Sequence, residues 1–282
     1  AEQRLFRNLN PFSKVAFTTD GMGLLGVSGV SVRRWNAASG AELTRLGRLI
    51  APVFGVDCSP DGRYFVGAFG ISARLWDLAT GAEIRRFEGH AGAVSSAWFS
   101  PDGRMVLTAS HDKTARLWNA ESGAEIRRFE GHTDELYQAL FSPDGGLVLT
   151  TSVDRSARLW DAATGREIRQ FRNGPDESMF SATFSPDGRR IATSNWKNLV
   201  RVLDAASGAE LFRITLKDLS LNSATFTPGG RLLITTSNGL ELWDPETGAP
   251  VTRIATPSEF QASSTAFSPD GRLAIVGSGS AW

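Results

Sequence analysis

Cysteine and histidine are scarce in this sequence, with one and three residues respectively among 282. Cys58 has no partner within the chain for a disulfide, and a cysteine-based zinc cluster or an all-histidine metal site would need more ligands than the chain offers. No apolar run approaches the roughly 20 residues that a membrane-spanning helix needs. We therefore expect no metal, no cofactor and no membrane partner, and the lack of disulfides favours a cytoplasmic location.

An excess of charge of either sign is also missing. Lys and Arg together number 30, and Asp and Glu together number 30. Non-specific binding to nucleic acid or to an anionic membrane depends on excess basic charge. The composition therefore disfavours nucleic acid as a partner.

What the sequence does contain is an internal repeat. The tetrapeptide Ser-Pro-Asp-Gly occurs five times, and two degraded copies bring the total to seven. A complete copy accompanies four short strand-like segments, which in the third copy cover 94–99, 105–109, 114–118 and 125–129. A period of about 42 residues with four strands is typical of a propeller blade. The turn copies begin at residues 18, 59, 100, 142, 185, 227 and 268.

Two dipeptides recur within this period. Trp-Asp occurs at 76–77, 160–161 and 243–244, and Gly-His occurs at 89–90 and 131–132. With these pairs and the repeated turn, the sequence resembles the WD-repeat family over nearly its whole length. The identical stretches 82–90 and 124–132 indicate recent duplication, which is typical of bacterial members.

The resemblance implies an all-β fold, a seven-bladed β-propeller of four-stranded antiparallel blades. We expect residues 1–282 to form a single domain. The last copy lacks a fourth strand, whereas the N-terminus resembles one. The seventh blade is therefore expected to be shared between residues 1–8 and 263–282, so that the N-terminal strand completes the last blade and closes the ring.

The resemblance also implies a buried hydrogen-bond network of His, Ser or Thr, Asp and Trp within a blade. Ser, His and Asp could instead form a hydrolase triad. The set occurs twice at the same repeat position, which favours a structural role over an active site. The expected members are His90, Ser110, Asp112 and Trp118 in the third copy, and His132, Ser152, Asp154 and Trp160 in the fourth.

Large side chains gather at the start of the innermost strands and in the turns between second and third strands. Exposed aromatic residues often mark interaction sites. In one interpretation they form a partner-binding site on this face, with Trp196 replacing the structural Asp of the fifth copy. In the other they fill gaps between irregular blades. The candidate partner-binding residues are Phe54, Phe69, His111, Tyr137, Phe180 and Trp196.

The function that these observations favour is a non-catalytic interaction scaffold or regulatory binding platform. Its partner would be another protein, a peptide, or other domains of a longer chain. The alternative is a propeller enzyme, or a carbohydrate or nucleic-acid binder, that uses the central channel. Channel chemistry needs clustered polar residues on the innermost strands. The mostly small or apolar residues at those positions disfavour an enzyme.

Overall fold

The computed structural model describes residues 14–18, 20–28, 31–46, 53–172, 178–217, 219–237, 239–255, 262–268, 270–272 and 274–278. Its regular elements are all β-strands, which confirms the expected all-β class. Blades 1 to 3 contain β1 (Lys14–Phe17), β2 (Gly23–Ser28), β3 (Ser31–Asn36), β4 (Glu42–Leu46); β5 (Val53–Cys58), β6 (Tyr64–Phe69), β7 (Ser72–Asp77), β8 (Glu83–Phe87); β9 (Val94–Phe99), β10 (Met105–Ser110), β11 (Ala115–Asn119), β12 (Glu125–Phe129). Blades 4 to 6 contain β13 (Leu136–Phe141), β14 (Leu147–Ser152), β15 (Ser156–Asp161), β16 (Glu167–Arg172); β17 (Met179–Phe184), β18 (Arg190–Asn195), β19 (Leu199–Asp204), β20 (Glu210–Thr215); β21 (Leu221–Phe226), β22 (Leu232–Thr236), β23 (Gly239–Trp243), β24 (Pro250–Ala255).

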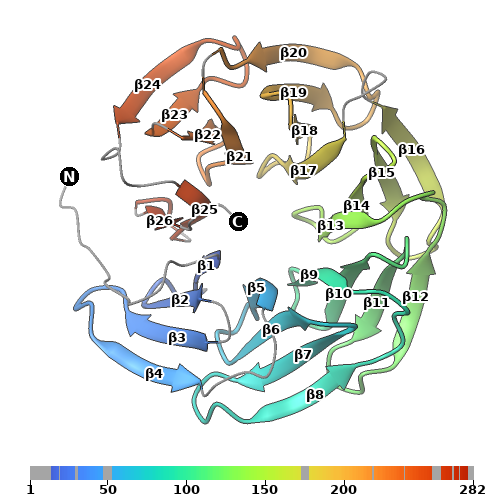
Figure 1. The fold of residues 1–282 in the computed structure, drawn as a ribbon, viewed down its shortest axis with the longest axis vertical. Helices are drawn as coiled ribbons and strands as arrows, with labels where there is room; N and C mark the ends of the chain where they lie inside the picture. Colours follow the sequence, from blue (N-terminus) through green and yellow to red (C-terminus); the bar gives the residue numbers. More distant parts are fainter. Residues whose placement is uncertain are drawn as a thin grey trace.

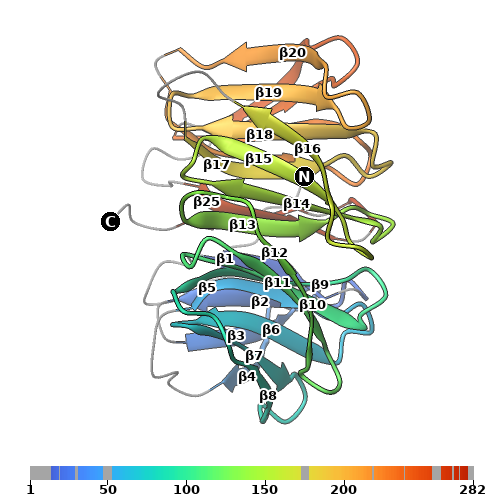
Figure 2. The ribbon, with the colours of Figure 1, turned by 90° about the vertical axis from the view of Figure 1, so that its right-hand side faces the viewer.

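Each blade is an antiparallel sheet whose strands pair in chain order, and the blades follow one another around a ring (Figure 1). The first strand of each blade lies near the centre and the fourth lies at the circumference. Figure 2 shows the ring edge-on, with the strands running across its thickness.

The blade count differs from the expected seven. Within the described residues six sheets have four strands, and the seventh copy forms only a two-stranded sheet of β25 (Ala262–Phe267) and β26 (Ala274–Ser278). This sheet contacts β21 and β1. The prediction of seven four-stranded blades, with the last one completed by the N-terminal strand, is therefore wrong. Residues 1–8 and 279–282, which were expected to complete the seventh blade, lie outside the described residues.

The reason for the error is that the repeated tetrapeptide marks a turn and not a sheet. It joins the first two strands of a unit, so a lone hairpin carries it as well as a complete blade does. Counting turns therefore counts the two-stranded sheet as a blade.

The hydrophobic core lies between neighbouring blades. One cluster joins Val66 and Phe87 of blade 2 to Val94, Phe99 and Trp118 of blade 3. The rings of Phe87 and Trp118 lie 6.0 Å apart across this seam. Strands covered on both faces need apolar residues at nearly every position, which explains the continuous apolar runs of the inner strands.

The antiparallel order gives the ring two different faces. The turns that join first to second and third to fourth strands lie on one face, which we call the turn face. The remaining connections, including the starts of the innermost strands, lie on the opposite face, which we call the rim face. The Ser-Pro-Asp-Gly copies are all on the turn face.

The chemistry of that turn is visible in blade 3. The Ser100 hydroxyl donates to Asp102 Oδ1 at 2.6 Å and accepts the Met105 N–H at 2.9 Å. The Arg104 N–H donates to the same Asp102 oxygen at 3.0 Å. Gly103 has φ of 73°, a conformation that favours glycine. Ser, Asp and Gly are thus each required by the turn.

The inner edges of the blades are covered by side chains of the preceding blade. Asp57 Oδ2 accepts the backbone N–H of Phe99 at 2.9 Å, and Ser96 Oγ accepts that of Ala139 at 3.1 Å. The first strand of a blade has a strand partner on one side only, so its free N–H groups need other acceptors. These bonds join blade 2 to blade 3 and blade 3 to blade 4.

The outer strands make a second contact between blades. The guanidinium groups of Arg85, Arg127 and Arg169 each donate to a backbone carbonyl in the next blade, of Ser122, Thr164 and Ala206, at 2.9, 2.8 and 2.8 Å. One arginine of each of these three outer strands therefore links adjacent blades.

We expect Arg127→Ala to lower the free energy of unfolding by about 1 kcal/mol, because the bond to the Thr164 carbonyl is lost. Urea denaturation of the purified chain measures this value. Arg128→Ala is the matched control, since the ion pairs described for Arg128 both lie within blade 3, with Glu125 and Glu130. The control should lose less than about 0.5 kcal/mol. Equal losses for the two variants would argue against the link.

Candidate functional site

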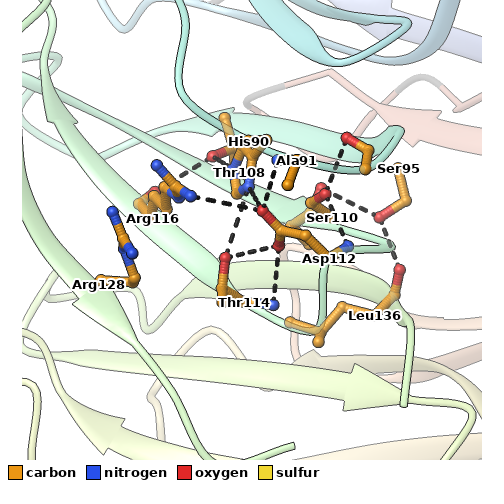
Figure 3. A network of polar contacts seen from close by, with 12 residues as sticks. His90, Ala91, Ser95, Thr108, Ser110, Asp112, Thr114, Arg116, Arg128 and Leu136 are labelled. Carbon is orange, nitrogen blue, oxygen red and sulfur yellow. Dashed lines mark hydrogen bonds and ion pairs between the residues drawn. The ribbon is translucent and has the colours of Figure 1, made fainter.

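The polar network of blade 3 is centred on a threonine that the sequence analysis did not select. His90 Nε2 lies 2.7 Å from Thr108 Oγ1, and the Trp118 indole N–H donates to the same hydroxyl oxygen at 2.9 Å. The other ring nitrogen, His90 Nδ1, lies 2.8 Å from Asp112 Oδ2 (Figure 3). His90, Asp112 and Trp118 are thus brought together, with Thr108 between the two rings.

Ser110 lies beside this chain of bonds and not within it. Its hydroxyl donates to the Gly92 carbonyl at 3.1 Å and accepts the Asp112 N–H at 3.1 Å (Figure 3). It therefore fixes the turn that carries Asp112. The signal that could have identified Thr108 is its position ten residues before Trp118, which Thr150 and Trp160 repeat.

Burial determines the charge states in this network. Loss of solvent lowers the pKa of His90 despite the bond to Asp112. A neutral ring that donates from Nδ1 to Asp112 accepts the Thr108 hydroxyl proton at Nε2, which satisfies every bond. Burial opposes ionisation of Asp112, but bonds from Thr114 and His90 outweigh it and lower its pKa to about 2.

Blade 4 repeats this arrangement. His132 lies 2.7 Å from both Asp154 Oδ2 and Thr150 Oγ1, and the Trp160 N–H donates to Thr150 at 2.9 Å. Ser152 bonds to the carbonyls of Asp134 and Glu135 and accepts the Asp154 N–H.

The geometry does not suit a hydrolase triad. The hydroxyl bonded to His90 belongs to Thr108, whose exposed fraction is 0%. A nucleophile must reach its substrate, and a fully buried hydroxyl cannot. The two networks join strands and turns within their own blades.

The networks extend outward through arginine. Arg116 lies 3.5 Å from Asp112 and 2.9 Å from Glu125 on the outer strand. Arg158 likewise contacts Glu167 at 2.6 Å. Each network therefore reaches from the buried histidine to the circumference of the ring, an extension that the sequence analysis missed.

The rim face carries a repeated β-bulge at the second residue of the innermost strand. In β9 the pairing jumps from Val94 to Ser96 and leaves Ser95 out of register. A bulge redirects a side chain and is typical of functional edges. The candidate residues on the innermost strands therefore lie at bulges, where the backbone redirects their side chains. The same jump skips Tyr137 in β13, Phe180 in β17 and Asn222 in β21.

Among the candidates whose side chains the structure describes, Trp196 is the most exposed aromatic residue, at 65% exposure. It lies in the turn between β18 and β19, and its ring packs against Phe180 with centroids 4.5 Å apart and the ring planes tilted by 36°. Tyr137 and Phe180 are half-buried. The structure thus joins two of the candidates, from the inner strand and from the turn, into one aromatic pair.

The other three candidates are not part of this aromatic pair. Phe69 is 3% exposed and packs against Trp76 with ring centroids 4.7 Å apart, so it belongs to the core. His111 is exposed, and its Nδ1 lies 3.5 Å from Glu135. The side chain of Phe54 lies outside the described residues.

Strand register corrects one further expectation about Trp196. Asn195 pairs with Met179 in blade 5, and Ser110 pairs with Val94 in blade 3, so Asn195 and Ser110 are equivalent positions. Two residues further along, Lys197 is therefore the equivalent of Asp112. Trp196 therefore corresponds to His111 and does not replace the structural Asp. The Asn195 side chain accepts the N–H groups of Lys197 and Leu199 at 3.0 and 3.1 Å and so holds this turn.

The described residues contain no group of three or more His, Cys, Asp or Glu side chains placed to hold a metal ion. In that same part of the chain, no helix has the length and apolar character needed to cross a membrane.

Comparison with known proteins gives one family. The model described as "IFT122 first beta-propeller" matches residues 52–281, which include β5 to β26. No curated protein matches the sequence significantly. The family match and the ring of four-stranded blades agree with the WD-repeat-like propeller that the motifs indicated, whereas a bacterial origin stays a prediction.

Proposed function

Because the chain belongs to the IFT122 first beta-propeller family, we propose that it is a non-catalytic scaffold, with residues 1–282 acting as one domain. A propeller of this family fits a general role in protein interaction. In our proposal the scaffold binds a protein, a peptide, or another domain of a longer chain on its rim face. A cytoplasmic location stays a prediction.

The observation that carries this proposal is the exposure of Trp196. An indole ring buries a large area on binding, and tryptophan is enriched among the residues that dominate binding energy. At 65% exposure Trp196 leaves most of that area free. The fold of blade 5 does not need it there, because the equivalent positions hold His111 and Val153.

The surroundings of Trp196 hold it in place for binding. Phe180 supports one side of the ring, and Asn195 fixes the turn through two backbone bonds. A side chain that is already ordered loses less conformational entropy when a partner binds. Tyr137, displayed by the bulge of the adjacent blade, would extend the contact surface.

The channel alternative has less support. The inner strands use Asp57, Ser96 and Gln138 to accept backbone N–H groups of the following blade. These polar groups are therefore engaged in joining blades. No described observation favours catalysis or carbohydrate or nucleic-acid binding over protein binding.

The combined substitutions Tyr137→Ala and Trp196→Ala should raise the dissociation constant for a partner of the wild-type chain by at least about tenfold, because two aromatic contacts are lost. Titration calorimetry with the purified partner measures this change. Met22→Ala is the control, since Met22 is 67% exposed but lies on the turn face. It should stay within about twofold of wild type. Unchanged affinity in the double variant would exclude the rim face as the site.

A further inference from the structure

A hollow of roughly 740 Å³ lies on the turn face, between blades 4 and 5. It is within the size range of ligand-binding pockets. Blade 4 contributes Leu147, Leu159 and Ile168, and blade 5 contributes Pro186 and Ala205. The apolar part of the lining thus comes from both sides of one seam.

The turns of these two blades stand further apart than those of blades 2 and 3. A Cβ placed on Gly103 would lie 3.1 Å from Cδ of Pro60 across the seam of blades 2 and 3. A Cβ placed on Gly188 would lie 3.8 Å from Cδ of Pro143. The wider separation leaves space between the turns of blades 4 and 5.

Ile168 gives this hollow an exposed aliphatic side chain. It lies on the outer strand β16 and is 41% exposed. The next residue, Arg169, extends across the seam to the Ala206 carbonyl and links the blades beside the hollow. Ile126 occupies the same position in blade 3 and is 44% exposed, but it does not line this hollow.

Three carboxylates and one guanidinium line the same hollow, those of Asp144, Asp187, Asp204 and Arg189. Hydroxyl and backbone N–H donors bond to Oδ1 of each aspartate and lower the pKa of all three. The bonds described for these three side chains all use Oδ1. Each carboxylate is therefore ionised at neutral pH, with Oδ2 available to a ligand.

We infer that this hollow is a second docking site, and that it binds a linear segment of a partner protein in which an apolar side chain lies next to arginine or lysine. The apolar side chain would pack on Leu147 and Ile168. The basic side chains would pair with the aspartates, whose charge exceeds that of Arg189 by two. The site lies on the face opposite Trp196 and does not depend on the proposed function.

The test uses a library of random twelve-residue peptides displayed on phage and selected on the purified chain. Enriched peptides should share an apolar residue next to Arg or Lys. Their affinities are then measured by fluorescence anisotropy, and they should weaken as salt concentration rises because ion pairs are screened. Selection without such peptides would overturn the inference.

Matched variants locate the peptide. Ile168→Asp should weaken peptide binding by at least about tenfold. Asp187→Asn should weaken it by about threefold or more, although the amide oxygen of the new side chain can still accept the hydrogen bonds of the turn. Ile126→Asp, Asp102→Asn and Trp196→Ala should each stay within about twofold of wild type. Binding that survives Ile168→Asp and Asp187→Asn would contradict this site. Loss in Trp196→Ala alone would place the peptide on the rim face instead.

Discussion

Replacing Thr108 by valine should lower the free energy of unfolding by about 3 kcal/mol, because two buried groups lose their partner. The Thr108 hydroxyl bonds to both His90 Nε2 and the Trp118 N–H. All three side chains are buried, so water cannot replace the missing bonds. For a chain of this size, that loss corresponds to a decrease in melting temperature of roughly 5 °C.

Two controls distinguish this account from a general effect of substitution in the core. Thr108→Ser keeps the hydroxyl and should retain most of the stability. Ser110→Ala removes only the bonds to Gly92 and to the Asp112 N–H, and should cost about 1 kcal/mol. A larger loss of unfolding free energy for Ser110→Ala than for Thr108→Val would show that Ser110, and not Thr108, is the central residue of the network.

Asp57→Asn should make the chain more stable at pH 8, because Asp57 is ionised there at an energetic cost. Burial raises the pKa of Asp57 to about 7, although the N–H groups of Phe99 and Cys58 bond to its carboxylate. In the unfolded chain the pKa is about 3.9. Between about pH 4 and pH 7, Asp57 is therefore protonated to a greater extent in the native state than in the unfolded chain.

The sign of the pH dependence follows from this difference. The contribution of Asp57 to stability is fully present below about pH 4 and is lost as the pH rises through about 7. Asparagine carries no charge and still offers an oxygen to the Phe99 N–H, but its NH2 group replaces the oxygen that accepts the Cys58 N–H. The stability of Asp57→Asn relative to wild type should therefore rise by up to about 4 kcal/mol between pH 4 and pH 8.

Thermal denaturation from pH 4 to pH 8 measures this trend. Asp102→Asn is the opposite control, because bonds from Ser100 lower the pKa of Asp102 and its charge is favoured in the native turn. That variant should gain nothing at pH 8. A pH-independent difference between Asp57→Asn and wild type would show that Asp57 does not titrate in this range.

The elements of the fold could be predicted from the sequence because each repeat carries its own turn chemistry. The strands expected at 94–99 and 125–129 coincide with β9 and β12. The number of blades could not be predicted in the same way, since the Ser-Pro-Asp-Gly turn is present in a two-stranded hairpin as well.

The candidate site was less predictable because it depends on register and on neighbouring blades. The bulges that display Tyr137 and Phe180 are irregularities of strand pairing, which spacing along the chain does not reveal. Phe69 was expected in the same turn of its blade as Trp196, yet it is the last residue of β6 and packs against Trp76 within its own blade. Contacts between blades, such as the bond from Arg127 to Thr164, join residues 37 positions apart.

The measurement that tests the rim-face proposal most directly is photo-cross-linking in cells that produce the chain. A benzoylphenylalanine residue replaces Tyr137 in one variant and Met22 in another. We predict that one partner protein is captured from position 137 and not from position 22, and that adding Trp196→Ala abolishes this capture. Equal capture from position 22, or capture that persists after Trp196→Ala, would contradict a partner site built on Trp196.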